Sequence, residues 1–182
     1  MMSLTNRTFR LAFVVGMLAL VSACAAPADP KNMVASPTPG GSEFAAPLHS
    51  SMCVRNVTGG EETNPMWVSK VNNQDFHTAL AASLDTAGLT GAAAACKYPI
   101  DVNLLGLSQP SAGFDMEVTS HVNYKVYDAA SQPILLETIS AAYTAKMSDA
   151  FAGVERLKLA NEGSIRSSIS QFLDKLRAVK PQ

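Results

Sequence analysis

The sequence predicts an α+β fold, with a mostly antiparallel sheet of about four strands and two amphipathic helices on one face. Two observations lead to this fold class. Residues 114–127 alternate between apolar and polar side chains, which is typical of a long strand with one buried face. Residues 154–179 repeat apolar side chains at helical spacing. Such one-sided elements bury their apolar surfaces against one another, and the expected order is β-α-β-β-β-α.

The first half of the predicted domain contains one strand and one helix. Residues 52–58 form a strand candidate, and residues 66–68 could continue a strand. A short helix is expected to begin at Asn73, which is a suitable N-cap residue. Gly88 follows the last apolar position of this helix and is expected to end it.

The second half contributes the remaining strands and the long helix. Residues 100–104 alternate as a second strand, followed by the long strand over 114–127. A turn over 128–133 is expected to lead back into residues 134–145, whose β-branched content fits a hairpin partner. The helix over 154–179 is long enough to cross the whole sheet.

Composition excludes several classes of protein. The 182 residues are 47% hydrophobic, which is enough for the core of one domain. Lys and Arg number 14 against 15 Asp and Glu, so the chain lacks the positive charge expected of a nucleic-acid-binding protein. No repeat of about 20–50 residues is visible, which argues against solenoids and propellers.

The first residues have the pattern of an export signal. Arg7 and Arg10 precede an apolar run over 11–21, which is too short to span a bilayer, since a spanning helix needs about 20 apolar residues. The run ends at Val21-Ser22-Ala23-Cys24. This sequence resembles the lipobox of bacterial lipoproteins: an aliphatic residue, two small residues and a cysteine. The alternative is an ordinary secretory signal cleaved near Ala23, in which Cys24 has no role.

The lipobox resemblance implies a particular processing and location. Residues 1–23 would be a signal peptide, and Cys24 would become the acylated N-terminus, which holds the protein on a membrane through its acyl chains. In this family an Asp after the Cys often retains the protein at the inner membrane, whereas here the next residue is Ala25. The resemblance therefore implies an outer-membrane lipoprotein facing the periplasm, and the inner membrane is the alternative location.

The chain after the lipobox changes character near residue 50. Residues 24–50 hold five of the ten prolines and show no apolar period. We expect a flexible tether with a root-mean-square reach of about 30 Å, followed by a single globular domain over 51–182. The alternative is a strap that lies along the domain, with Met33, Val34 and Phe44 as anchors.

The order of elements extends the resemblance beyond the lipobox. The helix with Phe76, Leu80 and Leu84, the strand over 114–127 and the long terminal helix resemble small outer-membrane lipoproteins of the LPS-assembly and YajG-like kinds. This is a likeness of element order rather than of a sharp motif, so it implies a fold and assigns no function.

The cysteines and histidines give little sign of metal or redox chemistry. With Cys24 taken as the lipid acceptor, Cys53 and Cys96 remain as a pair, which predicts a disulfide in an oxidising compartment. The alternative is two separately buried thiols. The chain has no Cys-x-x-Cys motif and no His at ligand spacing, so we expect neither a metal site nor another cofactor.

No catalytic motif is recognisable. A serine nucleophile elbow and a glycine-rich phosphate loop are both missing from the sequence. Asp115 and Glu117 would lie about 7 Å apart on one strand face, a separation that glycoside hydrolases also use, but the simpler interpretation is a solvated strand face. Together with His121 and Lys125 they form a candidate binding face. Residues 65–67 either form an exposed patch or enter the core.

Two functions remain open. The first is a non-enzymatic accessory, binding or scaffold module of the cell envelope, held on the membrane by its lipid and recognising an envelope protein or a lipid-like ligand. The second is a periplasmic hydrolase or transferase whose site assembles from residues distant in the sequence. A pocket with convergent polar groups would favour the second; an open groove or a free sheet edge would favour the first.

Overall fold

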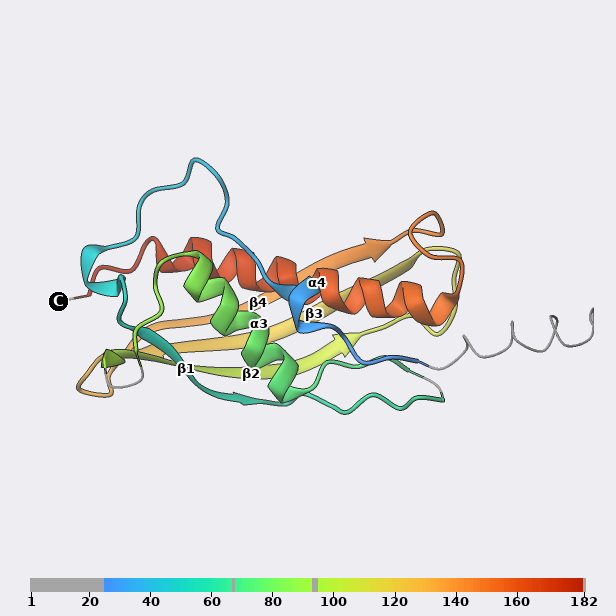
Figure 1. Ribbon diagram of the computed structural model, residues 1–182, viewed down its shortest axis with the longest axis horizontal. Coiled ribbons are helices and arrows are strands. Elements are labelled where there is room, and N and C mark those ends of the chain that lie inside the picture. Colours follow the sequence, from blue (N-terminus) through green and yellow to red (C-terminus); the bar gives the residue numbers. More distant parts are fainter. Residues whose placement is uncertain (1–24, 67, 93–94, 182) are drawn as a thin grey trace, which may run out of the picture.

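Four strands form one sheet in which neighbours in the chain are neighbours in space (Figure 1). This computed structural model describes residues 25–66, 68–92 and 95–181. The strands are β1 (Met52–Thr58), β2 (Tyr98–Ser108), β3 (Met116–Tyr127) and β4 (Pro133–Ala145). β1 pairs with β2 in parallel, and the β2–β3 and β3–β4 pairs are antiparallel. The prediction of a mostly antiparallel four-stranded sheet is confirmed.

Two helices cover one face of this sheet, as the sequence predicts (Figure 1). Helix α3 (Asn73–Thr86) connects the parallel strands β1 and β2, because parallel neighbours require a crossover. Helix α4 (Gly153–Leu176) runs along β3 and β4. The order β-α-β-β-β-α is therefore also confirmed.

The core lies between the helices and the sheet. Tyr124 of β3 stacks on Phe172 of α4, with ring centroids 4.3 Å apart, and meets the edge of Phe76 of α3 at 6.5 Å. The Tyr124 hydroxyl lies 3.0 Å from the Ser168 hydroxyl, which satisfies its hydrogen bond inside the core. Burial raises the pKa of Tyr124 above its usual range, so this hydroxyl stays protonated.

Two element boundaries differ from the prediction. The N-cap of α3 is Asn72, whose side chain accepts a hydrogen bond from the Asp75 N–H at 2.8 Å; the Asn73 side chain instead accepts from the Gly60 N–H. Strand β3 begins at Met116, and Phe114, expected on its buried face, is 81% exposed in the preceding loop. Gly88 does follow α3 with a φ of +70°, which suits glycine.

The segment expected as a flexible tether is part of the folded body. Residues 25–50, here called the N-terminal strap, cross the outer side of α3 and α4 and contain only two short helices, α2 (Pro30–Met33) and η1 (Ala46–Leu48) (Figure 1). Met33 and Leu48 are fully buried in the main core. The alternative of a strap is what the structure shows, and the described residues before Ser51 belong to the folded body.

Polar contacts hold the strap along its length. The Ala35 N–H donates to the Ser83 hydroxyl of α3 at 2.9 Å, and the Ser170 hydroxyl of α4 donates to the Ser36 carbonyl at 3.0 Å. Thr38 donates to Asp174 through both its N–H and its hydroxyl. The prolines explain why the strap has little regular structure, but they do not prevent an extended segment from packing against helices.

Candidate functional site

Three of the four predicted binding residues share the sheet face that the helices leave uncovered. Glu117 and Lys125 are exposed on β3, and His121 lies half-buried between them. Asp115 is separate from them, because it lies before the start of β3 and its carboxylate accepts a hydrogen bond from the Met147 N–H at 3.0 Å. Its role in the structure is to join two loops.

The uncovered face carries a series of cross-strand hydrogen bonds, and we call it the open sheet face. His121 bridges three strands: its Nε2 lies 3.3 Å from the Ser108 hydroxyl of β2, and its Nδ1 lies 2.8 Å from the Ser140 hydroxyl of β4. Further along, Asn123 donates to Thr138, and Thr144 donates to Glu117. This face therefore presents amides, hydroxyls and single charges of both signs.

The Ser108–His121 contact is the arrangement closest to a catalytic pair. A nucleophile–base pair needs a third group that orients the base, normally a carboxylate on its other nitrogen. Here that nitrogen meets another hydroxyl, Ser140, and the contact lies on an open surface. The arrangement suits hydrogen bonding to a partner better than proton transfer in a closed site.

A shallow groove of about 230 Å³ lies at the β1 end of the open sheet face. Its lining includes Asn56, Asn103, Asn123 and Lys125. Beside it, Arg55 donates to both carboxylate oxygens of Asp101, at 2.8 and 2.5 Å. These hydrogen bonds lower the pKa of Asp101 and raise that of Arg55, so both groups stay charged and hold the edge of the groove in place.

A larger open groove, of about 580 Å³, lies between β4 and the end of α4. Apolar side chains of β4 (Ile134 and Leu135) line one side, and Lys175 of α4, which pairs with Glu137 at 3.8 Å, lines the other. β4 is the last strand of the sheet, and in the described part of the chain no strand pairs with its outer backbone groups. The lining of this larger groove also includes the charged side chains of Asp128 and Lys180.

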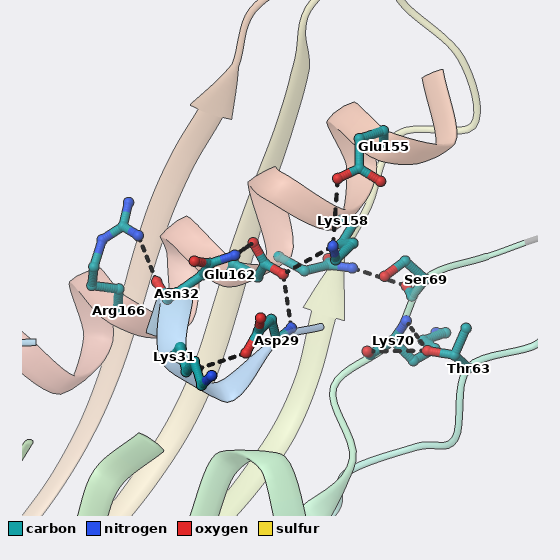
Figure 2. A network of polar contacts seen from close by, with 11 residues as sticks. Asp29, Lys31, Asn32, Thr63, Ser69, Lys70, Glu155, Lys158, Glu162 and Arg166 are labelled. Carbon is teal, nitrogen blue, oxygen red and sulfur yellow. Dashed lines mark hydrogen bonds and ion pairs between the residues drawn. The ribbon is translucent and has the colours of Figure 1, made fainter. Parts of the chain in front are cut away.

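A buried polar cluster joins the N-terminal strap to α4 (Figure 2). Glu162 is 1% exposed, and its two carboxylate oxygens accept from the Asp29 N–H at 2.8 Å and from the Asn32 side-chain amide at 2.9 Å. The Lys158 ammonium, one helical turn earlier, lies 3.8 Å from a carboxylate oxygen of Glu162 and balances its negative charge. Next to it, Asn161 donates to the Ser69 carbonyl at 2.9 Å. This cluster fixes the first part of the strap on the body.

Sequence reasoning missed this cluster, although one sign was present. The apolar stripe of the long helix repeats at Leu157 and Ile165, and the position halfway between them on the same face is Asn161. A polar residue on an apolar stripe is buried with a partner or marks a break in the packing. Glu162 gave no comparable sign, because its partners are backbone and side-chain groups of a segment expected to be unstructured.

The predicted disulfide is present. Cys53 of β1 is bonded to Cys96, with a Cα–Cα distance of 5.6 Å and a sequence separation of 43. The bond spans α3 and its flanking loops. Cys24 and Trp67, which the sequence analysis also singled out, lie outside the described residues.

The described ranges contain neither a metal-binding cluster nor a membrane-spanning helix. Across residues 25–66, 68–92 and 95–181, no three His, Cys, Asp or Glu side chains gather closely enough to hold a metal ion. In the same ranges, no helix has both the length and the apolar character needed to cross a membrane.

The described chain starts at one end of the body, beside three loops. The Ala25 N–H donates to the Pro65 carbonyl at 2.8 Å, and Ala25 itself is 5% exposed. The loop over 59–72, the β2–β3 loop over 109–115 and the β4–α4 loop over 146–152 lie at this same end of the sheet (Figure 1). We call it the anchor end; the β3–β4 turn lies at the opposite end.

The fold is shared with solved structures of distant sequence. No family model matches the chain, and no curated protein matches it in sequence. Protein XCC0632 from Xanthomonas campestris, described under the family model DUF330, has a TM-score of 0.57 at 10% identity, covering 82% of this chain and 92% of that one. This likeness establishes the fold alone.

Two further similar structures carry the word lipoprotein in their names. One is a protein of Caulobacter crescentus CB15 whose name proposes that it is a lipoprotein, with a TM-score of 0.44 at 14% identity, covering 56% of this chain and 80% of that one. The other is lipoprotein GNA1162 of Neisseria meningitidis, with a TM-score of 0.39 at 10% identity, covering 53% and 84%. None of the three names is that of an LPS-assembly or YajG-like lipoprotein, so that finer resemblance stays an expectation.

Proposed function

We propose that this protein is a lipid-anchored lipoprotein of the bacterial envelope whose body is a non-enzymatic binding or scaffold module. The observation that carries this proposal is the open sheet face, where hydroxyls, amides and single charges are presented on a rigid, hydrogen-bonded sheet. The other face of the sheet is buried under α3, α4 and the strap. Exposed polar groups on rigid elements are suited to binding a partner.

The lipobox supports the anchoring part of the proposal. Val21-Ser22-Ala23-Cys24 follows a short apolar run, and Ala25 in place of Asp favours the outer membrane, with the body facing the periplasm. The partner recognised by the open sheet face would be an envelope protein, because its polar groups offer hydrogen bonds rather than the apolar lining that a lipid-like ligand requires.

The anchoring is tested by the mass of the protein taken from membranes. We expect the mature chain to begin at Cys24 and to carry the extra mass of acyl chains. Cys24→Ser should either leave the precursor uncleaved or release the body into the periplasm, because acyl chains provide the membrane affinity. A mature chain with a free thiol at Cys24, or one that still begins at Met1, would contradict the anchoring.

The binding role predicts graded effects on the open sheet face. We expect Glu117→Ala to weaken photo-crosslinking of an envelope protein to this face by about two- to fivefold, the value of an exposed ion pair worth up to about 1 kcal/mol. Glu117→Lys should weaken it further, because it adds repulsion. Both variants should unfold within about 0.5 kcal/mol of the parent. The matched control is Asp85→Lys on α3, which should leave crosslinking unchanged.

The Ser108–His121 contact supports a second candidate, a hydrolase or transferase. An enzyme would respond to His121→Ala differently: turnover would be abolished while binding survived. Saturable hydrolysis by the purified protein that disappears in either Ser108→Ala or His121→Ala would refute the binding-module proposal. Crosslinking that falls in the graded order described above, with no such hydrolysis, would support it.

A further inference from the structure

We infer that the anchor end of the body rests against the bilayer and inserts the apolar tips of its three loops among the lipid headgroups. This inference rests on the proposed acylation of Cys24 and extends it. It adds a second contact with the membrane, made by protein side chains, and it gives the body a fixed orientation.

The proposed lipid anchor is next to the folded body in the sequence. Cys24 is bonded to Ala25, and consecutive Cα atoms lie about 3.8 Å apart. The Ala25 N–H is bonded to the Pro65 carbonyl, the Ala28 N–H to the Lys70 carbonyl, and the strap beyond them is held by Glu162. An acylated Cys24 would therefore be one residue away from the folded body, and its acyl chains would draw the anchor end to the bilayer.

The anchor end exposes a group of large apolar side chains. Within the described ranges, seven large hydrophobic side chains are exposed, and four of them belong to the three loops of the anchor end. They are Met66 (75% exposed), Phe114 (81%), Met147 (44%) and Phe151 (88%). Single exposed apolar residues need no explanation, but a group of them on adjacent loops indicates an interaction surface.

Hydrogen bonds hold the three loops together as a rigid unit. Arg156 of α4 donates to the Phe151 carbonyl at 2.6 Å and to the Gly113 carbonyl at 3.3 Å, and so ties together the loops that carry both phenylalanines. The Asp115–Met147 hydrogen bond adds a second link between them. The loop of Met66 is joined through Gln109, which donates to the Ser69 carbonyl at 3.1 Å. The tips are therefore presented in a fixed arrangement, and inserting them costs little conformational entropy.

The location of the anchor identifies a bilayer, rather than a protein, as the occupant of this surface. Aromatic and apolar side chains at an interface typically reach about 5–10 Å into the boundary between headgroups and acyl chains. The acidic side chains at this end are engaged with the protein itself: Asp115 and Asp149 each accept a backbone N–H within the loops, from Met147 and Lys146, and Glu61 pairs with Lys70 at 3.2 Å. Weak insertion suffices, since the acyl chains already hold the loops at a high local concentration.

The consequence is an upright body. Helix α4, with 24 residues, is about 36 Å long and runs away from the anchor end along the sheet (Figure 1). The open sheet face and the edge of β4 would then stand roughly perpendicular to the membrane. The β3–β4 turn would be the part of the body farthest from the bilayer, and a partner would approach from the side.

The test uses the full chain, purified from membranes and reconstituted into phosphatidylcholine vesicles. An environment-sensitive dye is attached to one added thiol, in Phe151→Cys at the anchor end or in Ala129→Cys in the exposed β3–β4 turn as the matched control. We expect the emission of the dye at position 151 to shift to the blue on vesicles and to be quenched by lipid-borne quenchers about 5–10 Å below the headgroup surface. The dye at position 129 should show neither effect.

A second variant tests the role of the phenylalanines. With the dye on Met147→Cys, replacing both Phe114 and Phe151 by Ser should abolish the blue shift on vesicles, while the acyl chains keep the protein bound. Vesicle-bound protein whose dye at position 151 is unshifted would overturn this inference and leave the lipid anchor intact. A shift that appears without vesicles as protein concentration rises would instead indicate a second copy on this surface and would also overturn it. Failure of the chain to bind vesicles, with Cys24 unmodified, would overturn both this inference and the proposed anchoring.

Discussion

Replacing both Cys53 and Cys96 by alanine is expected to lower the free energy of unfolding by about 4 kcal/mol. The bond closes a loop of 43 positions by sequence separation, and its loss frees the unfolded chain to explore many more conformations. This cost is large against the 5–15 kcal/mol that typically stabilises a domain. Urea unfolding of the parent and the double variant, followed by circular dichroism, measures the difference.

The control for the disulfide uses a reductant. Reducing agent should lower the urea midpoint of the parent to that of the double variant, and it should leave the double variant unchanged. Parent and variant free energies of unfolding that agree within about 1 kcal/mol without reductant would show that the bond does not stabilise the protein in the way expected.

Met33→Ala in the N-terminal strap is expected to cost about 2–5 kcal/mol, the range for truncating a buried aliphatic side chain. The Met33 side chain reaches from the strap into the main core and is fully buried there, so its truncation leaves a cavity. The sequence alone suggested that this segment was a tether. The matched control is Met147→Ala, at a side chain that is 44% exposed, where a change within about 0.5 kcal/mol is expected. Equal unfolding free energies for the two variants would contradict the buried strap.

The regular elements could be predicted because each has one apolar face. The alternation over 114–127 and the helical repeat over 154–179 each carry their own period, and the structure contains both elements with ends shifted by only a few residues. The disulfide could be predicted from cysteine parity and compartment. These signals are local, or depend on counting alone.

The strap could not be predicted in the same way, because its packing has no period. Met33 and Leu48 are buried at single points of an irregular segment, and its polar contacts reach residues more than 130 positions away, such as Glu162 and Asp174. Proline content indicates that a segment lacks regular structure but says nothing about whether it packs. Long-range pairing of this kind is visible only once the helices are in place.

The candidate binding face was predicted in part. Period-two alternation places Glu117, His121 and Lys125 on one face, and they do share it. Asp115 lies one residue before the strand. Its side-chain position is determined by the hydrogen bond from Met147 and not by the alternation of the strand. The partners of His121 on β2 and β4 depend on strand register, which the sequence pattern does not fix across the sheet.

The central claim is that the body sits directly on the bilayer, because the strap is folded and leaves no tether after Cys24. Neutron reflectometry of the full chain, isolated from membranes and reconstituted in a supported bilayer, measures the spacing between the protein layer and the headgroups. We predict a dense protein layer that begins at the headgroups with no hydrated gap. A water-filled layer of about 30 Å beneath the protein, the reach of a flexible segment of this length, would contradict the claim.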